Sequence, residues 1–158
     1  MRVLGIDFTS RPTRKKPLVC MHCTLDKQVL RADRLDEWTE FAQFELALKR
    51  PGPWIAGIDF PFGQSRKFIG NIGWPNTWAG YVAHAESLGR EGFRDGLDNY
   101  RRKRPFGDKE HRRTTDVAAS SISPQKLYGV PVGLMFFELG CSDPASRSLC
   151  FTRATRPE

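Results

Sequence analysis

The sequence predicts an α/β fold on a mixed sheet, whose elements begin in the order strand, strand, strand, helix, strand. Three observations support this prediction. Short apolar runs end at turn-forming residues, the hydrophobic period changes once from that of strands to that of a helix, and Gly-Ile-Asp-Phe occurs twice, at 5–8 and 57–60. With 158 residues, 39% of them hydrophobic, the chain has the size and composition of one globular domain.

The N-terminal region is expected to form an antiparallel meander. Residues 2–8 are mostly apolar and stop at Thr-Ser-Arg-Pro, as a buried first strand would. Residues 17–24 and 28–32 are typical of two further short strands, joined by a hairpin turn at 25–27. The first three strands should therefore be neighbours in one sheet.

A crossover helix and a fourth strand follow. From Asp36 to Leu48 apolar residues recur mainly at steps of three and four, which predicts an amphipathic helix with Asp33 or Asp36 as its N-cap. Residues 50–53, Arg-Pro-Gly-Pro, end this helix, and 54–60 is a second apolar strand.

This order places two acids at one edge of the sheet. A strand, a helix and a strand in succession usually make two parallel strands with a right-handed connection. If strands one and four are neighbours, Asp7 and Asp59 lie near the same carboxyl edge. Open α/β sheets usually bind their ligands at that edge.

The second half of the chain is expected to be mainly helical. Helices are predicted at 77–88 and 91–103 with a break at Gly89, followed by an irregular polar loop over 104–125. The apolar segment 130–139 is either a short buried helix or a strand, because periodicity does not separate the two at this length. We expect a single domain over 1–139 and a polar tail over 140–158.

Composition limits the class of protein. No run approaches the roughly 20 apolar residues of a membrane span, and Asp7 interrupts the apolar stretch that a signal peptide would need, so a cytoplasmic protein without a membrane partner is expected. The dinucleotide, P-loop and hydrolase-elbow signatures are absent. Cys20 and Cys23 have no second pair to complete four zinc ligands, and free thiols are expected.

The net charge of +7 suggests an anionic partner, either nucleic acid or another phosphorylated ligand. Much of the excess lies in residues 101–113, RRKRPFGDKEHRR. The alternative is that this run is a solvated helix end and loop.

Asp7 and Asp59 are the first candidates for chemistry. Two carboxylates inside apolar strands are costly unless something positive lies between them, and hard cations such as Mg²⁺ or Mn²⁺ take carboxylate oxygens. Bound metals of this kind activate water in phosphodiester cleavage. Alternatively, each Asp only starts a turn by accepting backbone hydrogen bonds.

Other polar side chains are further candidates. Asp116 and Glu138 are possible catalytic acids, with a helix N-cap and a solvated helix residue as the respective alternatives. Trp74, Trp78 and Tyr81 are candidates for stacking on bases, or else pack in the core. Basic side chains in predicted loops are candidates for binding phosphate, namely Arg14, Lys15, Lys16, Lys109, His111, Arg112 and Arg113.

The topology and four stretches of the chain resemble a known family. The order of elements, with an acid on strands one and four, resembles the ribonuclease H-like fold. The segments GIDFTSRPTRKKP, GPWIAGIDFPFG, GDKEHRRTTDVAASSISPQKL and VPVGLMFFE are similar to domain-of-unknown-function family 429, described as predicted ribonuclease H-like nucleases. The resemblance covers roughly residues 3–139.

The resemblance implies a magnesium- or manganese-dependent nuclease. Asp7 and Asp59 match the two strand acids that hold the metal, and polar positions of the family are matched by Lys16, Lys109, Arg113 and Asp116. Family members usually continue into another helix and strand, which the tail from Gly140 does not resemble. The final strand is therefore expected to be missing, with 149–152 as a short substitute.

Two other classes of function remain open at this point. One is an inactive or truncated nucleic-acid binding module that relies on the charge of 101–113. The other is a phosphotransferase similar to actin or the sugar kinases, whose first strand is also followed by an acid and small hydroxyl residues. Against it, such enzymes normally use two domains of this kind with glycine-rich phosphate loops.

Overall fold

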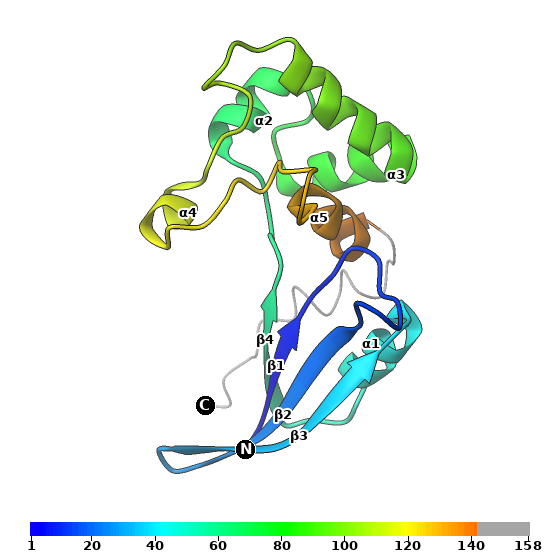
Figure 1. Ribbon diagram of the computed structural model, residues 1–158, viewed down its shortest axis with the longest axis vertical. Coiled ribbons are helices and arrows are strands. Elements are labelled where there is room, and N and C mark those ends of the chain that lie inside the picture. The colour runs from blue at the N-terminus through cyan, green and yellow to red at the C-terminus, as the bar shows by residue number, and fades with distance from the viewer. Residues whose placement is uncertain (142–158) are drawn as a thin grey trace. The chain divides into compact units, whose positions relative to one another are not determined.

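The computed structural model describes residues 1–141, with side chains as far as Glu138, and divides the chain into two compact units (Figure 1). Unit 1 is Met1–Phe60 and unit 2 is Pro61–Glu158. The expected single domain over 1–139 stays a prediction. The expected polar tail and the substitute strand at 149–152 lie outside the described residues, apart from the first two residues of the tail.

Unit 1 is an α/β unit with a four-stranded mixed sheet, which confirms the predicted class. Its strands lie in the order β3-β2-β1-β4, antiparallel except for the parallel pair of β1 and β4. The elements in chain order are β1 (Arg2–Asp7), β2 (Leu18–Asp26), β3 (Val29–Trp38), α1 (Phe41–Leu48) and β4 (Trp54–Asp59).

The two faces of β1 are different. Leu4, Ile6 and Phe8 are buried in the core of unit 1, whereas Gly5 and Asp7 are exposed on the opposite face. Because side chains alternate along a strand, this period-two pattern fixes which face receives the core. The ring of Phe8 packs on three aromatic rings, with centroids 5.6 to 5.9 Å away, from Phe41, Phe44 and Phe60.

The predicted start of the first helix is wrong. Residues 33–38 continue β3, where Asp36 lies opposite Cys20 and Trp38 opposite Leu18. Helix α1 begins only at Phe41, and its N-cap is Glu40, not Asp33 or Asp36. The Gln43 side chain accepts a hydrogen bond from the Glu40 amide, so this short helix is closed by a capping box.

Unit 2 is helical in the part that the structure describes. It contains α2 (Arg66–Ile72), α3 (Trp78–Arg102), α4 (Thr114–Ala118) and α5 (Val132–Cys141). The predicted helices on either side of Gly89 are confirmed as α3, in which Gly89 itself has φ 67° and ψ 174°. The segment that periodicity left undecided is the helix α5, and the expected loop over 104–125 contains one short helix, α4.

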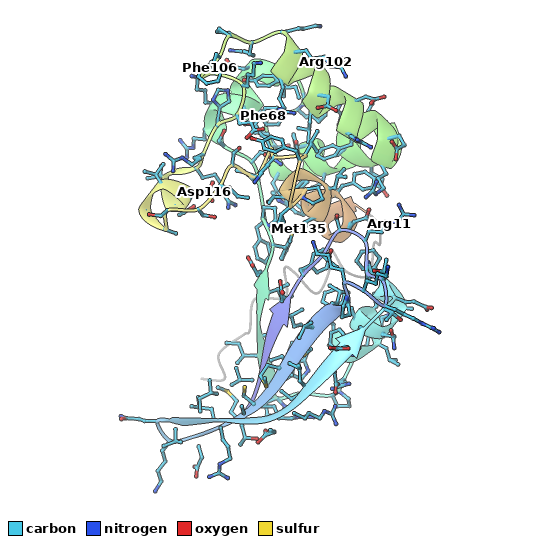
Figure 2. All side chains as sticks on the ribbon, in the orientation of Figure 1. Arg11, Phe68, Arg102, Phe106, Asp116 and Met135 are labelled. Carbon is cyan, nitrogen blue, oxygen red and sulfur yellow. The ribbon has the colours of Figure 1, made fainter. Side chains whose placement is uncertain are left out.

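The core of unit 2 is an aromatic cluster between α2, α3 and α5. Phe68, labelled in Figure 2, is fully buried in this cluster, and the ring of Tyr100 lies edge-on to it at 4.9 Å. Phe93 and Phe136 stack at 6.1 Å and join α3 to α5. Burial of these large rings supplies most of the hydrophobic stabilisation available to this unit.

Candidate functional site

Asp7 and Asp59 are direct partners in the register of β1 and β4. In parallel strands such partners lie on the same face with Cα atoms about 4.8 Å apart. The predicted convergence of the two acids on one edge is therefore confirmed. Within the described residues, neither carboxylate accepts a hydrogen bond or joins an ion pair.

Both carboxylates are exposed, so the predicted burial of these acids is wrong. The apolar residues of the strands lie on the other face, and the two aspartates share their face with Gly5 and Gly57. The unfavourable term is therefore repulsion between neighbouring like charges, not desolvation.

The two glycines leave the surface beside the acids open. Gly5 lies opposite Gly57, and a Cβ atom added to either would have no neighbour within 4 Å. The main chain is therefore bare next to the carboxylates. A ligand can approach the acids there without displacing a side chain.

The donor chemistry at this edge suits a hard cation. Mg²⁺ is commonly held in proteins by one or two carboxylates together with water and substrate phosphates. Asp7 and Asp59 would supply two carboxylates from adjacent strands. Among the described residues, no group of three or more His, Cys, Asp or Glu residues is placed to hold a metal ion.

The loop after β1 carries the predicted basic residues of unit 1. Thr13 and Lys16 form a small bridge through two backbone hydrogen bonds of 3.0 and 3.1 Å, with Arg14 and Lys15 at its tip. All three basic side chains are exposed. Because this loop leaves β1 directly after Asp7, it concentrates positive charge at the same end of the strand.

Asp116 is the N3 residue of α4 and not its N-cap, which is Arg113. The Arg113 guanidinium grips the Asp116 carboxylate with bonds of 2.6 and 2.9 Å, and the Arg113 amide donates a third of 2.7 Å. These bonds hold the pKa of Asp116 below its usual range. The remaining guanidinium nitrogen, Nη1 of Arg113, donates to the Gly63 carbonyl 3.2 Å away.

Glu138 belongs to a different pair in unit 2. Its Oε1 lies 2.6 Å from Nε of Arg90 on α3, and its side chain is only 12% exposed. The alternative of a solvated helix residue is therefore wrong. The pair links α5 to α3 beside the aromatic core, so the carboxylate has a structural partner.

His111 is buried at the centre of a polar network. Its Nε2 lies 2.7 Å from the Tyr100 hydroxyl, and its amide donates to Oε1 of Gln125 at 2.7 Å. Its carbonyl accepts from the Ser123 hydroxyl at 2.9 Å. Burial lowers the pKa of His111, so the neutral ring is the favoured form at neutral pH. The neighbouring Lys109 is exposed.

The basic run 101–113 is partly neutralised within unit 2. Arg101 lies 3.2 Å from Asp98 and 3.0 Å from Glu110, and Arg104 lies 2.9 Å from Asp108. Hydrogen bonds from Lys67 and Arg104 lower the pKa of Asp108 to about 2. The exposed cations of the run are Arg102, Lys103, Lys109 and Arg112.

The predicted stacking residues have different environments. Trp74 packs between Tyr81, His84 and Phe93, and Tyr81 is buried in the same core. Trp78 is 38% exposed and lines a cleft of about 530 Å³ at the start of α3. Phe106, labelled in Figure 2, is 99% exposed on the loop after α3.

No sequence pattern singled out three arginines of unit 1 that line one cavity. Arg2 belongs to β1, Arg34 to β3 and Arg50 to the turn after α1, so the three are far apart in the chain. Their only sequence signal is the high arginine content. Only the fold brings them together.

No family model matches the chain, and no curated protein and no solved structure matches it. Among the described helices, none combines the length and the apolar character that crossing a membrane requires.

Proposed function

We propose that the protein is a nuclease of ribonuclease H-like fold that hydrolyses phosphodiester bonds of nucleic acid with Mg²⁺ or Mn²⁺ held by Asp7 and Asp59. The observation that carries this proposal is the register of β1 and β4, which pairs the two aspartates on one exposed face. The repulsion between these carboxylates is relieved by a divalent cation.

The fold of unit 1 supports the ribonuclease H-like assignment. The order of elements is β-β-β-α-β, with β1 between β2 and β4 and with β4 parallel to β1. This is the arrangement that the resemblance to family 429 implies. Membership of that family is part of the proposal.

The residues of this chain would have separate roles in binding metal and phosphate. Asp7 and Asp59 hold the cation, which supplies charge stabilisation and an activated water when bound. Lys16 and its basic neighbours contact phosphate oxygens and orient the nucleic-acid strand. The main chain at Gly5 and Gly57 carries no side chain, so the substrate can reach the two aspartates.

Manganese binding tests the site directly. Calorimetric titration of the wild type should give saturable binding, and Asp7→Asn or Asp59→Asn should weaken it by about tenfold or more, because each removes one charged ligand. Asp26→Asn is the matched control, since Asp26 is exposed at the other end of β2 and its side chain has no partner among the described residues.

Cleavage of single- and double-stranded DNA and RNA tests the activity. We expect cleavage with Mg²⁺ or Mn²⁺, none in chelator, and loss of activity in the Asp7 and Asp59 variants but not in Asp26→Asn. Without metal, Asp7→Asn should raise the free energy of unfolding by about 0.2–1 kcal/mol, because it removes like-charge repulsion.

Two results would contradict the proposal. One is manganese binding that is equal in the wild type and both aspartate variants. The other is salt-sensitive nucleic-acid binding without cleavage under any metal, which would make the protein a binding module that uses its exposed cations.

A further inference from the structure

Unit 1 contains a cavity of about 250 Å³ on the face of the sheet that carries α1. Its apolar wall is formed by Leu4 and Trp54, which belong to β1 and β4. Its polar wall consists of Arg2, His22, Cys23, Thr24, Asp33, Arg34 and Arg50.

The cavity is separate from the pair of aspartates. Arg2 begins β1 and Asp7 ends it, a distance of about 17 Å along an extended strand. Leu4 faces the core side, whereas Asp7 lies on the opposite face. A ligand in this cavity would therefore not touch the proposed metal site.

A bulge shapes the polar wall. The register of β2 and β3 shifts between His22 and Cys23, so that Asp33 is an extra residue of β3. Consecutive strand residues normally face opposite sides, but Asp33 and Arg34 both line the cavity. Bulges re-aim side chains in this way and are common next to functional sites.

The charge of the cavity is unbalanced. Three arginines face one aspartate among its lining residues. Asp33 already accepts the Thr24 hydroxyl at 2.8 Å, and Asp36, just outside the lining, accepts from His22 at 2.8 Å and Arg34 at 3.1 Å.

Two of the arginines that line the cavity have guanidinium donors without a partner among the described residues. Arg2 uses one Nη to reach the Pro51 carbonyl at 2.8 Å. The Arg50 side chain is half-buried and has no hydrogen bond or ion pair within residues 1–141. Guanidinium donors that lack an acceptor favour contact with an oxyanion such as phosphate, to which they can donate two parallel hydrogen bonds.

We propose that this cavity binds a small phosphate, either inorganic phosphate or a phosphate monoester. Arg50 and Arg2 donate to the phosphate oxygens, Arg34 adds charge, and Leu4 and Trp54 contact whatever group the phosphate carries. His22, held by Asp36, also lines the cavity.

Phosphate titration in metal chelator tests this proposal without using any activity. Calorimetry or phosphorus NMR with inorganic phosphate should give saturable binding that weakens as sodium chloride is raised. Phenyl phosphate should bind as well or better if the natural ligand carries an apolar group. Tighter binding of inorganic phosphate identifies the free ion as the ligand, and both outcomes support the site.

Arg50→Gln should weaken binding of both probes by about tenfold or more, because one charge-assisted hydrogen bond is lost. Arg50→Lys keeps the positive charge but loses the planar guanidinium with its paired donors. Its affinity for both probes should lie between those of Arg50→Gln and the wild type. Lys49→Gln is the matched control, since Lys49 is exposed, adjacent in sequence and absent from the cavity wall.

Circular dichroism establishes that the variants fold. The proposal is overturned if neither probe binds the wild type, or if Arg50→Gln and Lys49→Gln reduce binding equally. Asp7→Asn should leave phosphate binding unchanged, so failure here is distinguishable from failure of the proposed nuclease.

Discussion

Some carboxylates of this protein are paired with cations, whereas two others lie next to each other without one in the described part of the chain. Asp116, Glu138 and Asp108 have cationic partners within unit 2. Asp7 and Asp59 have none within the described residues and lie next to each other. A carboxylate with a cationic partner contributes to stability. Two adjacent carboxylates without such a partner repel each other and reduce stability unless a cation binds.

The charge of Asp116 should stabilise the fold. Asp116→Asn removes the charge that Arg113 grips in a site where Asp116 is 3% exposed. We expect the free energy of unfolding to fall by about 2–3 kcal/mol, because hydrogen bonds to a charged group are lost. Urea denaturation measures this change, and unchanged stability would contradict the assigned pairing.

His111 should make stability depend on pH. Its pKa is lowered by burial, so the unfolded chain takes up a proton more readily than the folded one. The contribution of the neutral His111 ring to the free energy of unfolding is complete above about pH 6.5 and is lost as pH falls below that value. Urea unfolding at pH 7.5, 6.5 and 5.5 should show this loss, and His111→Gln should reduce the slope.

Asp108, which faces His111, does not interfere in that range. The pKa of Asp108 is about 2, and unfolded aspartates titrate near 3.9, so its contribution is lost only below about pH 4. A wild type and a His111→Gln variant with the same slope between pH 7.5 and 5.5 would contradict the prediction.

The pairing of Asp7 with Asp59 was predictable because it follows from one tetrapeptide that occurs twice and from the rule for crossover connections. Their exposure was not predicted. In the sequence, Gly5 and Gly57 are part of apolar runs. In the sheet, they leave one face of each strand without a side chain at these positions. The cavity arginines were missed because they come from three separate elements, and because sequence spacing does not report the bulge beside Arg34.

At the scale of elements, local signals were reliable where one period dominates. The strands β1 and β4 and the two segments of α3 were predicted within two residues of their ends. The start of α1 was not, because the charged residues 33–37 carry no apolar period and their pairing with β2 is a tertiary effect. Helix α2 was missed because its seven residues are too few for a pattern.

The break within α3 should be specific to glycine. Gly89 has φ 67° and ψ 174°, a region that is essentially closed to other residues. Gly89→Ala should therefore lower the free energy of unfolding by about 1–3 kcal/mol. Gly70→Ala, in α2 with no atom near an added Cβ, is the control and should raise it by about 0.5–1 kcal/mol.

Denaturant unfolding measures both glycine variants. Equal effects of the two substitutions would show that the backbone at Gly89 is an ordinary helical one. A stabilised Gly89→Ala variant would mean that α3 is continuous.

At the scale of the whole molecule, the two units have different kinds of core. Unit 1 packs part of one face of its sheet against the helix α1 (Figure 1). Asp7 and Asp59 lie on the other face. Unit 2 buries aromatic rings between helices and uses ion pairs at the periphery. The proposed chemistry depends on exposed groups of unit 1, whereas the ion pairs of Asp116, Glu138 and Asp108 belong to unit 2.

The register of Asp7 with Asp59 also bears on how unit 1 assembles. The two residues are 52 positions apart, whereas β2 and β3 pair across a tight turn, so closing β4 onto β1 costs more chain entropy than the hairpin does. The carboxylates become neighbours only when that long loop has closed. A cation that needs both of them would therefore bind the completed sheet and not the open chain, and would stabilise the pairing of β4 with β1.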